Sequence, residues 1–364
     1  MNIIVNYEIF ALQKYGGISR YYIELANAIK KSAHSVKVLA PVHINKYLPA
    51  QSNDMVSTAK VPFLYRNFIY DFSDQQNRKQ TQNYLESMKV DILHLTYYTS
   101  APFPLTTAKK VITIHDMIYE LFPMGLPEID HVVQCKKKYI ADADLIIAVS
   151  ENTKKDLVEM YPAAEGKTTV VLHGINTTVY DHAIAYSASE PYLLYVGSRN
   201  GYKNFQLLIE IYKQSPALHE KYRLICFGGD EFNSSEIEII GNFRDRVQHL
   251  NGDDAILASV YKGAHLFVYP SSYEGFGMPV LEAMAAGCPV VCANSSSLPE
   301  VAGDAAFYFP PDVPEQMKMV LIDACENAEL RKSMVQKGLK RVKEFTWDIC
   351  AQKTIEAYQK LLDK

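Results

Sequence analysis

The sequence predicts an α/β protein with two doubly wound domains, each built on a parallel sheet. Short apolar runs rich in valine, isoleucine and leucine alternate with longer segments that carry apolar residues at helical spacing, almost throughout the 364 residues. Near-continuous apolar strands separated by helices are typical of a parallel sheet covered on both faces. The length exceeds one ordinary core and suits two domains of about 100–200 residues each.

The first domain is expected over residues 1–180. Its strands are expected at 3–7, 36–40, 91–95, 110–115, 145–149 and 169–172. Ser150 follows one of these strands and should cap the helix that begins after it. In such sheets, ligands lie at the carboxyl ends of the strands. Polar residues at those ends are therefore the first candidates for a site.

The second domain is expected over residues 190–346, after a small, polar stretch, DHAIAYSASEP, that suits a linker. Its strands are expected at 192–196, 223–227, 247–250, 266–269 and 289–293. The last helix, about 347–364, is expected to pack back on the first domain. The two Rossmann-like units should face each other across a cleft.

Composition excludes several classes of protein. Net charge is 37 − 41 = −4, so the basic excess of a nucleic-acid-binding protein is missing. The start, MNIIVNYEIF, resembles a first strand rather than a signal peptide, and no run approaches the roughly 18 apolar residues of a membrane-spanning helix. The six cysteines are scattered without a CxxC pair, which favours reduced thiols in a cytoplasmic protein over a metal site.

The most specific motif is YPSSYEGFGMPVLEAMAAGCPVV, at residues 269–291. Glu274 lies on a loop after a strand, the glycines of 275–277 precede a helix, and Pro279 suits its first turn. Amides at this helix N-terminus favour a phosphate group. Glu282 lies one turn into an otherwise apolar helix, where a carboxylate needs partners. Two carboxylates seven residues apart can thus serve different parts of one ligand.

A second motif, YVGSRNGYKNF, follows the first strand of the second domain. Arg199 and Lys203 place two cations where a leaving diphosphate gains charge, so they stabilise the transition state more than the ground state. At an effective dielectric near 20, one cation about 4 Å from a unit charge contributes roughly 4 kcal/mol, or about three decades of rate.

The first domain carries further candidates at its strand ends. Gly16 and Gly17, in KYGGISR, allow close backbone approach before a helix. His115 and Asp116, in VITIHD, end a strand that should point at the cleft and suit a polar contact or a proton relay. Two residues near the end of the preceding strand, His94 and Tyr97, are further candidates on the acceptor side.

These segments resemble, in order and over nearly the whole chain, the retaining glycosyltransferases of family four, which have the GT-B fold. The resemblance implies that Glu274 lies near the transferred sugar, that Glu282 binds the ribose hydroxyls, and that His115 reaches the sugar or the acceptor. It also implies a set of donor-binding groups: Gly16, Gly17, Arg199, Lys203, Gly275, Phe276 and Gly277.

No metal or cofactor is expected, because the nucleotide sugar is a substrate and no D-x-D motif stands in a suitable place. Residues 142–144 match those letters but lead into a strand of the first domain. The resemblance implies retention of anomeric configuration by a front-face route in which the leaving phosphate accepts the acceptor's proton. Glu274 as a nucleophile is the open alternative.

The resemblance extends to bacterial O-antigen and capsule mannosyltransferases. It favours GDP-mannose as donor, ahead of UDP-hexoses, UDP-N-acetylhexosamines and dTDP-rhamnose, and a glycan or polyprenyl-diphosphate-linked acceptor. Residues 60–72, KVPFLYRNFIYDF, and the lysines of 136–138 suggest peripheral contact with the inner face of the cytoplasmic membrane. Core aromatics and a solvated lysine run explain them equally well.

Two alternatives differ in class. An NAD-dependent epimerase or oxidoreductase needs a G-x-G-x-x-G fingerprint and usually a Tyr-x-x-x-Lys pair, and neither is recognised here. A catalytically silent partner subunit that only binds nucleotide sugars is the second alternative. The intact Glu274, Glu282, Arg199 and Lys203 argue against it.

Overall fold

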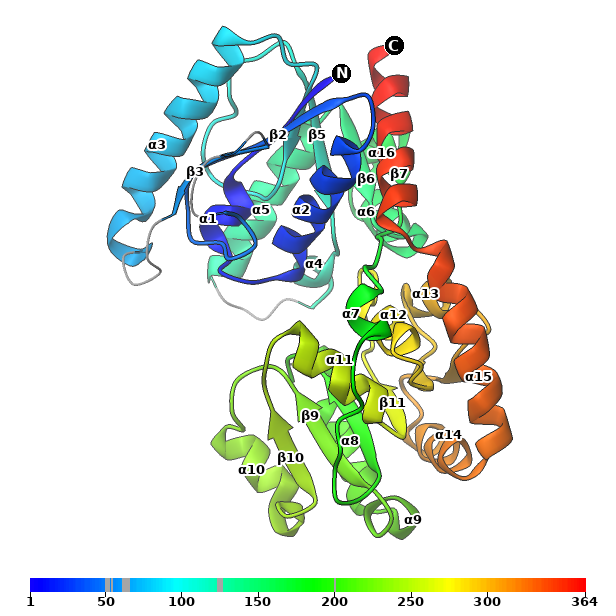
Figure 1. Ribbon diagram of the computed structural model, residues 1–364. Coiled ribbons are helices and arrows are strands. Elements are labelled where there is room, and N and C mark those ends of the chain that lie inside the picture. The colour runs from blue at the N-terminus through cyan, green and yellow to red at the C-terminus, as the bar shows by residue number, and fades with distance from the viewer. Residues whose placement is uncertain (50–52, 54, 61–65, 123–126, 200) are drawn as a thin grey trace. The chain divides into compact units, whose positions relative to one another are not determined.

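The computed structural model describes residues 1–49, 53, 55–60, 66–122, 127–199 and 201–364, without the side chains of 56–60, 66–73 and 127–128 (Figure 1). Its contacts divide the chain into two compact units. Unit 1 comprises Met1–Gly174 and Trp347–Lys364, and unit 2 comprises Ile175–Thr346. The stretch expected as a linker is counted with unit 2, where the amide of Tyr186 donates to the carbonyl of Ser259.

Unit 1 is built on a parallel sheet with the strand order β3-β2-β1-β4-β5-β6-β7 among the described residues. Its strands are β1 (Asn2–Val5), β2 (Ser35–His43), β3 (Val56–Lys60), β4 (Ile92–Leu95), β5 (Lys109–Ile114), β6 (Leu145–Ala148) and β7 (Thr168–Val170). Its helices are α1 (Glu8–Leu12), α2 (Gly17–Lys30), α3 (Arg66–Ser87), α4 (Ile118–Leu121), α5 (Pro127–Asp142), α6 (Glu151–Met160), η2 (Pro162–Lys167) and α16 (Trp347–Leu362).

Unit 2 repeats this arrangement, with the order β10-β9-β8-β11-β12-β13 in its described part. Its strands are β8 (Tyr192–Val196), β9 (Arg223–Phe227), β10 (Val247–Leu250), β11 (Leu266–Tyr269), β12 (Val290–Ala293) and β13 (Phe307–Phe309). Its helices are α7 (Thr178–Asp181), η3 (Gly201–Lys203), α8 (Phe205–Lys213), α9 (Pro216–His219), α10 (Ser234–Ile240), η4 (Gly241–Phe243), α11 (Asp254–Gly263), α12 (Met278–Ala285), α13 (Leu298–Ala302), α14 (Pro314–Glu326), α15 (Ala328–Arg341) and η5 (Val342–Glu344). The predicted pair of parallel, doubly wound sheets is confirmed.

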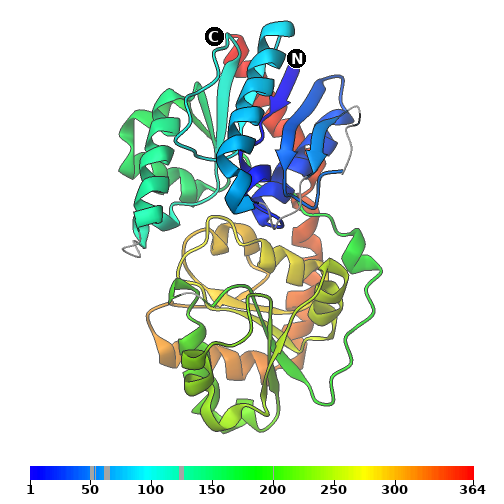
Figure 2. The same ribbon diagram turned by 90° about the vertical axis from the view of Figure 1, so that its left-hand side faces the viewer.

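The last helix, α16, lies against unit 1, where it is red in Figures 1 and 2. It shares a buried apolar cluster with α2 and the first strands, and contributes five residues to it: Cys350, Ala351, Ala357, Tyr358 and Leu361. The Tyr358 hydroxyl lies 2.7 Å from Nδ1 of His94, whose Nε2 lies 2.9 Å from the Thr113 hydroxyl. A polar contact inside an apolar interface thus fixes where α16 sits on unit 1.

Buried histidines should make unit 1 sensitive to acid. Burial lowers the pKa of His94 and of His173 to about 3. Between the ordinary value near 6.5 and that value, the unfolded chain binds protons that the folded chain does not, so acidification favours unfolding by roughly 1.4 kcal/mol per histidine per pH unit. We expect the urea midpoint of unit 1 to fall from pH 7 to pH 5, less steeply in His94→Gln. The exposed-site variant His182→Gln should keep the wild-type slope, and a shared slope for all three proteins would contradict the assignment.

No helix in the described part of the chain is long and apolar enough to cross a membrane. Each of the six cysteines is buried and carries a free thiol.

Candidate active site

The candidate site of unit 2 lies where strand order reverses, between β8 and its neighbour β11. Chain connections leave these two strands in opposite directions along the sheet, which opens a crevice at their carboxyl ends. The loop after β8 carries Arg199 and Lys203, and the loop after β11 carries Glu274. Both motifs singled out in the sequence therefore reach the same sheet edge.

Lys203 and Glu274 form an ion pair at this edge. Nζ of Lys203 lies 2.5 Å from Oε1 of Glu274, and the two side chains are only 12% and 10% exposed. The Tyr269 hydroxyl accepts a second hydrogen bond from the same ammonium at 3.3 Å. Asn204, in a left-handed conformation at φ 52°, holds the two loops together by donating to the Pro270 carbonyl and the Ser272 hydroxyl. The cation and the carboxylate are thus preorganised side by side.

The Glu274 loop is fixed by the segment after β12. The Ser297 hydroxyl lies 2.8 Å from the carbonyl oxygens of Glu274 and Phe276, and the amide of Glu274 donates to the hydroxyl of Ser296 at 2.9 Å. Neither these serines nor Asn204 were predicted as site residues from the sequence. The signal for the serines was the run of three, residues 295–297, directly after the β12 strand.

Gly277 starts α12 from a backbone conformation that favours glycine. Its φ is 104°, and an added Cβ would lie 2.8 Å from Cδ2 of Leu298. We expect Gly277→Ala to lower the stability of unit 2 by about 1–3 kcal/mol, seen as a lower midpoint of thermal unfolding. Gly201→Ala is the matched control in unit 2, because an added Cβ there meets nothing within 4 Å among the described residues. Equal midpoints for the two variants would contradict the strain.

Glu282 lies half-buried, one turn into α12, and accepts a hydrogen bond from the Tyr261 hydroxyl of α11 at 3.2 Å. Pro279 occupies the first turn of the same helix, as predicted. The two glutamates of the motif therefore have different surroundings. Glu274 is paired with a cation on the β8 side, whereas Glu282 contacts a neutral hydroxyl on the helical side. Different surroundings suit contacts with different parts of one ligand.

Arg199 has a different set of partners from Lys203, although the sequence places both cations at one diphosphate. Its guanidinium donates to Glu236 through Nε at 2.6 Å and to the carbonyl oxygens of Gly228 and Asp230. Its side chain is only 5% exposed. Glu236 also completes the capping box of α10 with Asn233. Arg199 thereby holds the loop after β9 against α10, a role that the spacing of the motif did not reveal.

In unit 1, Gly16 lies against the side chain of Gln13. The Gln13 carboxamide oxygen accepts from the amide of Ser19 in the first turn of α2, and a Cβ on Gly16 would lie 2.3 Å from that oxygen. Gly17 has open space around it, because an added Cβ would meet nothing within 4 Å. Gly16 thus allows the close approach of the Gln13 side chain, and Gly17 leaves room beside the start of α2.

His115 follows β5 in a cluster of rings. Its ring centre lies 5.0 Å from that of Tyr21 and 5.6 Å from that of His173, and its Nε2 is buried with no hydrogen-bond partner in the described residues. Burial above all, and then His173, lowers the pKa of His115 well below its ordinary value. The neighbouring Asp116 accepts a hydrogen bond from the amide of Ile118, which begins α4. A neutral imidazole next to the turn is therefore favoured.

Two sequence expectations for unit 1 need correction. His94 was a candidate for acceptor contact, but it is fully buried in the core, and both ring nitrogens lie within hydrogen-bond distance of protein hydroxyls. Lys136 was counted with a surface lysine run, but it is 1% exposed, whereas Lys137 and Lys138 are exposed. Tyr97 is half-buried, as a ligand contact would need. The side chains of 60–72 lie outside the described residues.

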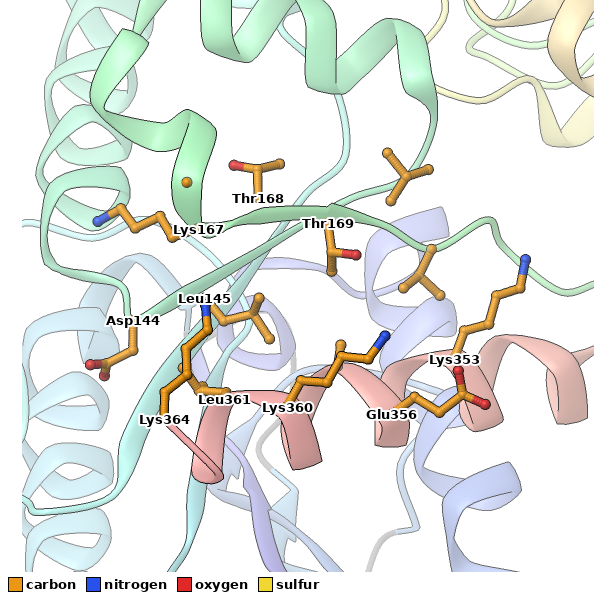
Figure 3. Close-up of a pocket in the computed structure, with 14 residues that line it drawn as sticks. Asp144, Leu145, Lys167, Thr168, Thr169, Lys353, Glu356, Lys360, Leu361 and Lys364 are labelled. Carbon is orange, nitrogen blue, oxygen red and sulfur yellow. The ribbon is translucent and has the colours of Figure 1, made fainter.

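A separate pocket of about 370 Å³ lies in unit 1 between β7 and α16 (Figure 3). Apolar side chains line its base, namely Leu145, Val171, Ala357 and Leu361. Four lysines border it, namely Lys167, Lys353, Lys360 and Lys364, with Asp144 and Glu356 as the acidic side chains. The pocket therefore combines an apolar base with a cationic rim.

Comparison with known proteins agrees with the geometry of both units. The family model "Glycosyltransferase Family 4" matches residues 15–179, and "Glycosyl transferases group 1" matches residues 181–341. O-antigen chain mannosyltransferase B of Escherichia coli is 28% identical over 95% of this chain and 96% of its own length. Sucrose-phosphate synthase of Thermosynechococcus elongatus superposes with a TM-score of 0.76 at 18% identity, over 99% of this chain and 98% of that one.

A second solved structure, HepE of Anabaena in complex with UDP and glucose, superposes with a TM-score of 0.69 at 17% identity, over 98% of this chain and 99% of that one. The two adjoining family matches, on two parallel doubly wound units, define a glycosyltransferase of the GT-B fold. More narrowly, the chain belongs to glycosyltransferase family 4.

Proposed function

We propose that this glycosyltransferase moves a hexose from a nucleotide-diphosphate donor to a glycan acceptor, with retention of anomeric configuration and without a divalent metal. The observation that carries the proposal is the Lys203–Glu274 pair, buried at the strand-order reversal of unit 2. A preorganised cation beside a carboxylate suits a reaction in which negative charge develops on a leaving phosphate while positive charge develops on the sugar.

Unit 2 is proposed to hold the donor. Lys203 and the amides of Gly275, Phe276 and Gly277 before α12 would face the diphosphate, and Glu282 would accept from the ribose hydroxyls. Arg199 donates to Glu236, so we propose that it contacts the diphosphate only if part of that contact is lost. While the contact with Glu236 is kept, Arg199 acts by holding the loop after β9. The bond between the anomeric carbon and the phosphate oxygen breaks, the acceptor oxygen bonds to that carbon from the same face, and the leaving phosphate takes the acceptor's proton.

Unit 1 is proposed to bind the acceptor, through His115 and the polar groups of Asp116 and Tyr97. GDP-mannose is the proposed donor, because the full-length relative reported above is named an O-antigen chain mannosyltransferase. The same relative supports a surface polysaccharide as the product. Gly16 and Gly17, at the start of α2, would complete the diphosphate and acceptor surroundings.

The proposal is tested by calorimetry and product analysis with GDP-mannose, UDP-glucose, UDP-N-acetylglucosamine and dTDP-rhamnose, in EDTA. We expect selective binding of one donor, weakened in Glu282→Ala, and an α-linked product from an α-linked donor by NMR. Lys221→Met, an exposed lysine of unit 2, is the matched control. Binding of no donor, or binding indifferent to Glu282→Ala, would contradict the site. A requirement for added metal would contradict metal-independent transfer.

Peripheral contact with an anionic membrane is proposed for the pocket between β7 and α16. Lys353 and Lys360 are seven residues apart, so they share one face of α16, and Lys364 borders the same pocket just beyond the end of the helix. Lysine heads around an apolar base suit anionic lipid headgroups. We expect the protein to float with phosphatidylglycerol vesicles at low salt, and the charge-reversed triple variant at these three lysines to stay at the bottom. Equal flotation of both proteins, or of neither, would overturn this contact.

A further inference from the structure

Unit 1 contains a buried ion pair that the proposed mechanism leaves without a role. Nζ of Lys136 lies 2.9 Å from Oε2 of Glu120, and the two side chains are only 2% and 6% exposed. Removing two charges from water costs several kcal/mol per ion, and apolar residues in such places often give equal or higher stability. The second carboxylate oxygen of Glu120 is also buried and has no hydrogen-bond partner among the described residues, which adds to that cost. Stability alone therefore does not account for this pair.

The geometry of the pair points to the turn after β5. Nζ of Lys136 also donates to the main-chain oxygen of Asp116, at 2.7 Å. Lys136 comes from α5, Glu120 from α4, and Asp116 from the turn between β5 and α4. One ammonium thus joins two helices to the peptide between Asp116 and Met117, one residue beyond His115. The ring of Tyr98, after β4, lies beneath the same ammonium at 5.7 Å.

Among the described residues, Lys136 supplies the hydrogen bond to the carbonyl oxygen of Asp116. The turn at residues 115–117 joins a buried strand to a short helix, and its other hydrogen bonds are local: the amide of Ile118 donates to the Asp116 carboxylate, and the amide of Leu121 donates to the Met117 carbonyl. If the Asp116 carbonyl rotated away, the buried ammonium would keep Glu120 but lose one hydrogen-bond acceptor, at a cost of about 1–3 kcal/mol. Lys136 therefore sets the orientation of the Asp116–Met117 peptide, one residue beyond His115.

We propose that Lys136 is a positioning residue for the acceptor half of the reaction, which holds the His115–Asp116 turn in its productive shape through the Asp116 carbonyl. The role of His115 in transfer rests on the proposed function, whereas the contact between Lys136 and the Asp116 carbonyl does not depend on it. Its positive charge also disfavours protonation of His115, in the same direction as burial. Lys136 touches neither sugar nor phosphate in this proposal.

The test uses the full chain and a charge-balanced variant, Lys136→Met with Glu120→Gln, because removing one partner alone would leave a buried charge. Lys137→Met is the matched control, since Lys137 is the next residue of α5 and is exposed. The first readout is the histidine ring NMR titration of ¹³C-labelled protein, with the His115 signal assigned by His115→Gln. We expect the His115 signal to move and its apparent pKa to rise in the double variant, with no change in the control.

The second readout is transfer from GDP-mannose to octyl α-mannoside. We expect kcat over KM for the acceptor to fall about 10- to 100-fold in the double variant, with KM for the donor unchanged. Unchanged acceptor kinetics in a folded double variant would overturn the proposal. If the wild-type protein transfers no mannose, that result contradicts the proposed donor and acceptor but does not test the role of Lys136. The NMR titration then tests that role by itself, and an unmoved His115 signal in the double variant overturns it. If the double variant does not fold, Lys136→Gln with Glu120→Gln takes its place, because it removes both charges and keeps side chains of similar size and polarity. An unmoved His115 signal in that variant overturns the proposal.

Discussion

Replacing Lys203 with methionine is expected to lower kcat for sugar transfer about a thousandfold. The ammonium lies 2.5 Å from Glu274 in a largely buried pair, so little water is present to screen it. One cation near 4 Å from the charge that develops on the leaving phosphate contributes roughly 4 kcal/mol at an effective dielectric of 20, which corresponds to about three decades of rate. Steady-state kinetics with saturating donor measures the effect on the chemical step.

The variant also leaves the Glu274 carboxylate without its cation, so a loss of stability has to be separated from a loss of catalysis. The double variant Lys203→Met with Glu274→Gln removes both charges, and Lys221→Met removes an exposed lysine of the same unit. The first should remain folded and inactive, and the second should match the wild type. A Lys203→Met protein that is folded and retains a tenth or more of wild-type kcat would exclude Lys203 from charge stabilisation.

The sequence located Lys203 and Glu274 because both follow apolar strands that must be neighbours in a doubly wound sheet. Strand ends meet at one edge, so residues there meet even when 71 positions separate them. Arg199 shows where this reasoning stops. Its partners are Glu236, in the first turn of α10, and two carbonyl oxygens of the loop after β9, and no hydrophobic period determines the path of that loop. Loop contacts of this kind depend on three-dimensional packing, and the spacing of a motif does not contain them.

The burial of Lys136 was also not predicted, although the helical periodicity of α5 indicates it. Three consecutive lysines on a helix look like a solvated face, but consecutive residues point in directions about 100° apart. In α5, Cys135, Lys136, Tyr139 and Ile140 are buried, whereas Lys137 and Lys138 are exposed. Helical periodicity alone would have placed Lys136 on the buried stripe. Three lysines in a row favoured the interpretation of an exposed face, so the buried position of Lys136 was not predicted. A buried ammonium needs a carboxylate partner, and in the structure this partner is Glu120.

Of the four strands at the sheet edges in the described part of the chain, β7 and β10 were predicted, and β3 and β13 were not. The central strands β6, β8, β11 and β12 are continuous apolar runs, LIIA, YLLYV, LFVY and VVCA, because both faces of each strand are covered. By contrast, β3 carries the mixed sequence VSTAK, and β13 has only three residues, FYF. The 22-residue α3 was not predicted either, since its mean sequence is polar and shows little amphipathic period.

Replacing Tyr358 with alanine is expected to destabilise unit 1 by about 3–5 kcal/mol, the cost of deleting a large buried aromatic side chain. Tyr358 is fully buried among the apolar residues that join α16 to α2, and its hydroxyl is the partner of His94 Nδ1 at 2.7 Å. The deletion would leave both a cavity and an unpaired buried nitrogen. Hydrogen exchange in denaturant, read separately for peptides of each unit, measures the effect where a single unfolding curve would mix two units.

Gln359→Ala is the matched control, because Gln359 is the next residue of α16 and is exposed. Since α16 is the only described segment after residue 174 that belongs to unit 1, loosening it should raise exchange in α2 and β1 while leaving unit 2 at wild-type protection. Protection of α2 that is equal in Tyr358→Ala and Gln359→Ala would mean that α16 only covers unit 1. The expected loss of protection would instead show that the last 18 residues are part of the core of unit 1. That core supports the His115–Asp116 turn, because His94, whose ring contacts the Tyr358 hydroxyl, also contacts Thr113 of β5, two residues before His115.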